Sequence, residues 1–106
     1  MLRRSLTAVL EKNSTFASDF ETEPYEVAWA SEARWFVRVF EIEGRLQVAP
    51  EVSPDGLEWC AEGSARLAID AAGLYSLALR DFGHWLRLRT AVEGQARVQI
   101  LLALKG

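Results

Sequence analysis

The segment Val52-Ser53-Pro54-Asp55-Gly56-Leu57-Glu58-Trp59 lies between two stretches that have the pattern of β-strands. Pro54 presets φ at about −65° for the first corner of a turn, and the Asp55 side chain can accept hydrogen bonds from the nearby backbone. Gly56 supplies a positive φ, which most other residues resist. The segment therefore predicts a tight turn inside a β-hairpin, and with it a fold made of antiparallel strands.

Similar turn signals recur along the chain about every 8 to 12 residues, a spacing typical of an antiparallel sandwich. Between them, apolar and polar residues alternate, as they do in a strand with one buried face. The fold class expected is all-β: a single-domain antiparallel β-sandwich, jelly-roll-like, with about eight strands over residues 1–106. The predicted strands are Leu6–Leu10, Trp35–Ile42, Arg45–Val52, Leu57–Ala61, Arg66–Ile69, Leu74–Arg80, Trp85–Ala91 and Ala96–Leu104.

Three details of this pattern concern turns and edges. Glu43-Gly44 is predicted to reverse the chain between two strands, and Glu93-Gly94 to break it before the last strand. Pro50 lacks an amide donor, which indicates an edge position or a bulge. In Leu57–Ala61, Leu57 and Trp59 are expected to point into the core.

Two stretches permit a helix as well as a strand. In residues 1–25, Leu2, Leu6, Val9 and Leu10 fit a helical stripe, whereas Leu6, Ala8 and Leu10 fit a strand. Because the rest of the chain has a β pattern, these residues are expected to form an N-terminal arm or an edge strand. The other stretch, 65–79, is rich in alanine and leucine, which favour helices, but its glycine at position 73 disfavours one.

The composition fits one hydrophobic core. The chain has 106 residues, of which 50% are hydrophobic, and a formal net charge of −3. This mild acidity argues against nucleic acid as a partner, because nucleic-acid-binding proteins carry a surplus of basic residues. The single cysteine forms no internal disulfide, and with the single histidine it makes no zinc site.

The N-terminal residues resemble a signal peptide only superficially. Met1-Leu2-Arg3-Arg4 precedes the apolar run Leu6–Leu10, but Thr7 interrupts this run and Glu11 ends it. The run is shorter than the apolar region of a secretory signal, and no stretch approaches the roughly 18 apolar residues of a membrane span. The expectation is a protein without a signal peptide, cytoplasmic or attached to a particle, with no membrane partner.

No combination of residues in this sequence is typical of an active site. His84 follows Asp81 by three residues, but no serine lies in a nucleophile elbow beside it. Cys60 has acidic neighbours, which disfavour a reactive thiolate. Glu51, Asp55 and Glu58 match no calcium-loop spacing. Catalytic residues, cofactors and metals are therefore all predicted to be absent.

One predicted strand suggests a surface for binding. In Trp85-Leu86-Arg87-Leu88-Arg89, the two leucines face the core, so Trp85, Arg87 and Arg89 line the outer face. Arg97 and Gln99 extend this patch if the last two predicted strands form a hairpin. Tryptophan and arginine are enriched at protein interfaces, and tryptophan also stacks on sugars. The alternative is that Trp85 only covers the sandwich edge while the arginines pair with acidic neighbours.

The order of these features resembles small β-sandwich or jelly-roll modules of phage and prophage virion proteins and of bacterial surface or assembly proteins. The resemblance rests on the spacing S-x-D-G-x-x-W from Ser53 to Trp59, followed by the strand from Trp85 to Arg89, and it covers about residues 34–104. A similar hairpin occurs in discoidin-type carbohydrate-binding domains, although this chain lacks their terminal cysteine pair. The resemblance implies a building block that is repeated in a particle or attached to one.

The leading hypothesis is therefore a non-enzymatic structural or assembly protein. It is expected to associate with itself as a homo-oligomer, or to decorate a larger particle such as a phage virion or a bacterial shell or filament. The expected partners are copies of the same chain and a capsid, tail or shell protein. The alternative is a carbohydrate- or ligand-binding β-sandwich module that uses Trp85.

Overall fold

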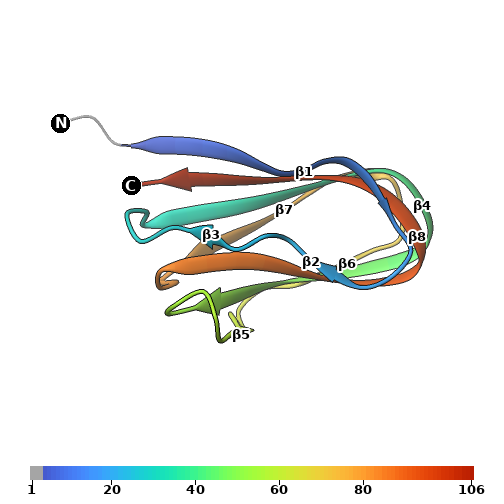
Figure 1. The fold of residues 1–106 in the computed structure, drawn as a ribbon. Helices are drawn as coiled ribbons and strands as arrows, with labels where there is room; N and C mark the ends of the chain where they lie inside the picture. The colour runs from blue at the N-terminus through green and yellow to red at the C-terminus, as the bar shows by residue number, and fades with distance from the viewer. Residues whose placement is uncertain (1–3) are drawn as a thin grey trace.

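The computed structural model describes residues 4–106, which form one antiparallel sheet of eight strands (Figure 1). The predicted all-β antiparallel fold is thereby confirmed. Met1, Leu2 and Arg3 lie outside the described residues, and with them the Leu2 of the helical alternative. The strands are β1 (Ser5–Phe16), β2 (Phe20–Glu21), β3 (Tyr25–Glu26), β4 (Glu32–Ser53), β5 (Cys60–Ala61), β6 (Leu67–Ile69), β7 (Gly73–Arg80) and β8 (Trp85–Lys105).

Two long strands, β4 and β8, organise the sheet. They pair with each other along almost their whole lengths, from Glu32 opposite Lys105 to Ser53 opposite Trp85. Midway, Gly44 lies opposite Gly94, and both strands bend there together, as Figure 1 shows at the closed end of the molecule. One half of each strand therefore belongs to one layer and the other half to a second layer, as in sandwiches whose strands pass around a corner.

The bend divides the shorter strands between the two layers. In the first layer, β1 pairs with the C-terminal half of β8, and β7 pairs with the N-terminal half of β4. In the second layer, β2 and β3 pair with the N-terminal half of β8, while β5 and β6 pair with the C-terminal half of β4. Each layer thus has the β4–β8 pair at its centre.

The core lies between the layers and consists mainly of alternating residues from both long strands, together with Val27, Ile69, Leu77, Leu79 and Phe82. In β8, the buried residues have even numbers from Leu86 to Leu104. In β4 the core-facing residues change from odd numbers up to Val39 to even numbers from Leu46, because of an irregularity between Val39 and Glu41, where Phe40 has no partner in β8. Glu51 and Ser53 are also buried, but on the outer face. The largest fully buried side chains include Trp35, Leu46, Ile69, Leu86, Leu88, Ile100, Leu102 and Leu104.

The two Glu-Gly pairs do not reverse the chain, which corrects the predicted turns at Glu43-Gly44 and Glu93-Gly94. Each strand runs through its glycine, at φ +95° for Gly44 and +85° for Gly94. A Cβ on Gly44 would lie 2.1 Å from the carbonyl oxygen of Glu93, and one on Gly94 would lie 2.0 Å from that of Glu43. Only glycine permits so close an approach of two backbones together with a positive φ.

The structure confirms some of the other predicted strands and contradicts others. The strand expected at Leu6–Leu10 lies within β1, and the helix considered for 65–79 is replaced by β6 and β7. The strand expected at Leu57–Ala61 is reduced to β5. The inward direction predicted for Leu57 and Trp59 is wrong, because Leu57 is 82% exposed and the Trp59 ring lies against Arg87, outside the core. Pro50 lies opposite Leu88, at a gap between the parts of β4 that pair with β5 and β6.

Replacement of Gly94 by alanine tests the importance of the bend. Gly94→Ala is expected to lower the free energy of unfolding by more than about 2 kcal/mol, because the new methyl group combines backbone strain with a clash against Glu43. Gly63→Ala is the matched control: Gly63 has φ +93°, but a Cβ added there would have nothing within 4 Å, so about 1 kcal/mol is expected. Equal losses in urea unfolding would contradict this role of the bend.

Candidate functional site

The candidate site is the outer face of the second layer, near the end of β4 and the start of β8. Ser53 lies opposite Trp85, and Glu51 lies opposite Arg87. Leu86 and Leu88 are fully buried, so the alternation directs Trp85 and Arg87 to the outer face, as predicted from the sequence. We call the group Glu51, Trp59, Trp85 and Arg87 the Trp–Arg face.

An ion pair shielded by an aromatic ring lies at the centre of this face. Arg87 Nε donates to Glu51 Oε1 at 2.7 Å, and the two side chains are only 22% and 11% exposed. The Arg87 guanidinium also lies over the Trp59 ring, with its Cζ 4.4 Å from the ring centroid. The Arg87 side chain is therefore held in one orientation by a carboxylate and by a π-system.

The turn after β4 brings Trp59 into this position. Ser53 Oγ accepts hydrogen bonds from the amides of Asp55 and Gly56, at 3.3 and 2.8 Å. Asp55 Oδ1 in turn accepts from the amides of Leu57 and Glu58, at 2.8 and 3.1 Å. These two side chains order the turn, as serine and aspartate commonly do.

The same backbone hydrogen bonds also affect the pKa of the Asp55 side chain. The amides of Leu57 and Glu58 stabilise the ionised carboxylate and so hold the pKa of Asp55 below its ordinary value of 3.8.

Gly56, at φ +79°, packs against Trp85: a Cβ there would lie 3.2 Å from two atoms of the indole ring. One side of Trp85 is thus covered by the turn, and the Trp–Arg face is pre-ordered.

The other predicted interface residues are not brought together. Arg89 is exposed and lies in register with Glu21 of β2. Arg97 and Gln99 lie beyond the bend, in the first layer, because β8 is one continuous strand and forms no hairpin with itself. Arg97 there pairs with Glu41 at 3.5 Å and donates to Asn13 at 3.0 Å. The patch expected from Trp85 to Gln99 is therefore divided between the two layers.

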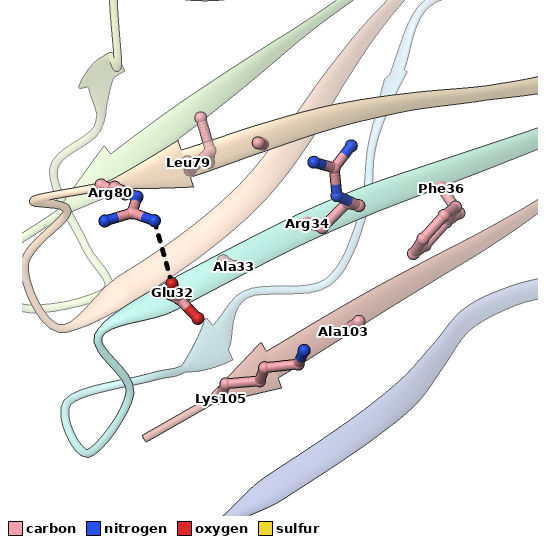
Figure 2. A pocket seen from close by; sticks show the side chains of 9 residues that line it. Glu32, Ala33, Arg34, Phe36, Leu79, Arg80, Ala103 and Lys105 are labelled. Atoms are coloured by element: carbon pink, nitrogen blue, oxygen red, sulfur yellow. Dashed lines mark hydrogen bonds and ion pairs between the residues drawn. The ribbon is translucent and has the colours of Figure 1, made fainter.

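A shallow hollow of about 350 Å³ lies on the outside of the first layer, between β7, β4 and β8 (Figure 2). Arg80 Nη2 donates to Glu32 Oε1 at 3.0 Å at one end, and Arg34 Nη1 donates to Ser76 Oγ at 2.9 Å. Sequence reasoning missed this hollow because its walls come from three strands that are far apart along the chain. Its lining residues are Glu32, Ala33, Arg34, Phe36, Ala78, Leu79, Arg80, Ala103 and Lys105.

The residues considered for chemistry lie apart from one another or have structural partners. His84 accepts a hydrogen bond from the Val27 amide through its backbone carbonyl, at 2.6 Å. Cys60 is an exposed free thiol, and Glu51 is engaged by Arg87. Within residues 4–106, no three His, Cys, Asp or Glu side chains are grouped as a metal site would require. The same residues contain no helix long and apolar enough to span a membrane.

The shielded ion pair should matter more to stability than an exposed pair of the same length. Glu51→Gln leaves Arg87 largely buried without a counter-charge, and is expected to cost about 2 kcal/mol of unfolding free energy. Glu93→Gln is the matched control, since Glu93 binds Arg45 at the same 2.7 Å but the side chains are 71% and 60% exposed. Its expected cost is below about 1 kcal/mol. Similar costs for both variants in urea unfolding would contradict the account of the Trp–Arg face.

The turn carboxylate predicts a dependence on pH. Because folding lowers the pKa of Asp55, ionised Asp55 stabilises the folded state above the ordinary pKa of 3.8, and this contribution is lost as the pH falls through the folded-state pKa. Wild type should therefore lose stability relative to Asp55→Asn on going from about pH 6 to about pH 3. Urea unfolding at both pH values measures this difference, and a ¹³C titration of the carboxyl group should give a pKa below 3.8. A stability difference that does not change with pH would contradict the assignment.

The fold of this chain is similar to the folds of several solved structures. No protein-family model matches the chain, and no curated protein matches its sequence significantly. Among solved structures, the PBSX exported protein XepA aligns with a TM-score of 0.71 and 13% identity, over 95% of this chain and 37% of that one. The SPBc2 prophage-derived protein YomS aligns with a TM-score of 0.67 and 10% identity, over 100% and 96%. A structure of Bacillus endospore appendages, described as a novel family of disulfide-linked pili, aligns with a TM-score of 0.59 and 10% identity, over 98% and 90%.

This chain thus spans little more than a third of the XepA chain but nearly all of the other two. Identities of 10–13% establish a shared fold and nothing more. That fold is a β-rich one found in phage, prophage and spore-appendage proteins.

Proposed function

We propose that this protein is a non-enzymatic structural or assembly protein, which associates with copies of itself or decorates a larger particle. The observation that carries the proposal is the Trp–Arg face: two tryptophans and an arginine held in place on the outside of a β-layer. Tryptophan and arginine are the residues most often found to dominate binding energy at protein interfaces.

The side chains of the Trp–Arg face are held in fixed orientations, which favours binding. Arg87 is held by Glu51 and by the Trp59 ring, and Trp85 rests against Gly56. Side chains that are already fixed lose little rotamer entropy when a partner covers them. The ion pair between Arg87 and Glu51 is also satisfied internally, so a partner can cover it without leaving a charge unpaired.

The comparisons add support from the fold. YomS and the spore-appendage protein match this chain over most of their lengths, and the second is described as forming pili. A β-sandwich of this size is suited to repetition in such assemblies. We extend this role to the present chain as a proposal, since the comparisons themselves concern the fold.

The mass in solution tests the proposal. Native mass spectrometry and sedimentation velocity at about 1 to 100 μM should reveal oligomers whose population rises with concentration. Arg89→Glu, which reverses an exposed charge beside the Trp–Arg face, should weaken association by about fivefold or more. Arg66→Glu is the control, because it makes the same charge change at an exposed position outside the face.

Two results would contradict the proposal. If the protein is a monomer at all these concentrations, it does not associate with itself. If in addition no particle component co-purifies with it, it does not decorate a particle either. Specific binding on a glycan array that is lost in Trp85→Ala would favour the carbohydrate-binding alternative instead.

A further inference from the structure

The free edges of the sheet differ in how they are protected. In the second layer, the flanking strands β2, β3, β5 and β6 are only two or three residues long. In the first layer, β1 and β7 are the outermost strands among the described residues. Proteins usually protect such edges with short strands, bulges, charges or prolines, because an open edge can pair with another chain.

β1 carries several of these protective features. Its pairing with β8 shifts register between Val9 and Glu11 and again between Glu11 and Ser14. It also carries two charged residues, Glu11 and Lys12, at its centre. An irregular, charged edge is a poor template for a further strand.

β7 carries almost none of them. It pairs with β4 over eight residues, from Arg80 opposite Glu32 to Gly73 opposite Val39, without a register shift. Its sequence, GLYSLALR, has no proline and no charged residue before Arg80. Leu74 on this strand is 56% exposed, one of four large hydrophobic residues that are exposed among those described. Among the described strands, β7 is therefore the regular and unprotected edge, and its one charged residue, Arg80, lies at its end.

We propose that β7 is the edge through which the chain pairs with a second copy of itself, as two antiparallel β7 strands related by a two-fold axis at Leu77. This inference rests on the self-association proposed above and adds a second surface for it, in the layer that does not carry the Trp–Arg face. The first layer of one copy and the first layer of the other would then form one continuous sheet across the axis.

The register follows from side-chain direction and charge. Residues facing each other across an antiparallel pair lie on the same face, so an outward residue must meet an outward residue. An axis at Leu77 satisfies this: Ser76 faces Ala78 of the second copy, and Leu74 faces its Arg80. The only charged residue of the strand then meets an apolar one, and no like charges oppose each other. The aliphatic part of Arg80 would also cover the exposed Leu74.

The surroundings of β7 prepare this edge for pairing. Arg80 is oriented by its bond to Glu32 (Figure 2). Ser76 is oriented by the hydrogen bond that it accepts from Arg34. Both contacts lie across the outer face of β4 and β7, so they leave the backbone edge of β7 open. Ala78 and Arg80 also line the hollow, so the hollows of the two copies would lie on either side of the axis.

A charge-swap experiment tests the surface. Ser76→Lys with Ala78→Lys places lysines opposite each other across the proposed axis, at positions that are exposed in the single chain. The dissociation constant of the dimer should rise about tenfold or more, and Ser76→Glu with Ala78→Glu should act in the same way. An equimolar mixture of the two double variants should form a heterodimer, because each lysine then faces a glutamate.

The controls separate this inference from the proposed function. Thr7→Lys with Val9→Lys adds the same charges to exposed positions of β1 and should leave association unchanged. Circular dichroism confirms that each variant is folded. If wild type associates and the β7 variants associate equally well, the β7 inference is wrong while self-association stands. If wild type is a monomer throughout, both are wrong.

Cross-linking tests the register. In a Cys60→Ser background, Ser76→Cys with Ala78→Cys places two pairs of thiols directly opposite, at the Cα separation of about 4.5–5.5 Å that a disulfide needs. Mild oxidation should give a covalent dimer. Ser76→Cys alone, and Thr7→Cys with Val9→Cys, should remain largely monomeric on a denaturing gel. Equal cross-linking in all three would overturn the proposed axis at Leu77.

Discussion

The structure depends on the close approach of two paired backbones at Gly44 and Gly94. At this point β4 and β8 bend together, and a Cβ added to either glycine would clash with the carbonyl oxygen of the glutamate that precedes the other glycine. The consequence is a sandwich made by folding one sheet over, so that the two longest strands contribute to both layers. Because hydrogen bonds continue through the corner, the layers are joined by the pairing of β4 with β8 as well as by their shared core.

This arrangement decides which surfaces remain available. With β4 and β8 central in both layers, the shorter strands form the edges, and within residues 4–106 only β1 and β7 are long enough to offer a full edge. It also places the end of β4 beside the start of β8, where Glu51 meets Arg87. The turn at 53–59 then folds back over this junction and covers it with Trp59 and the backbone of Gly56.

Two surfaces of this molecule are suited to contacts with other protein chains. The described residues offer a pre-ordered aromatic and basic face and an unprotected strand edge, both of which suit association with other protein chains. The similarity to XepA, YomS and the spore-appendage structure places the chain in a fold that phage, prophage and appendage proteins share. The two surfaces lie in different layers, so they permit contacts in two directions.

The sequence by itself determined the features that depend on local chemistry. Alternation in β8 correctly identified Leu86 and Leu88 as buried, because side-chain direction is a local property. Pro54, Asp55 and Gly56 correctly predicted that the chain reverses here, with a positive φ at Gly56, but the connection is longer than the tight turn expected and reaches Cys60 before a strand resumes. Only the tertiary structure decided what Glu-Gly does at positions 43–44 and 93–94, since a positive φ serves a reversal and a bend equally well. It likewise separated Arg97 and Gln99 from Trp85 and formed the hollow beside β7, because these depend on which strands become neighbours, and no local pattern specifies that pairing.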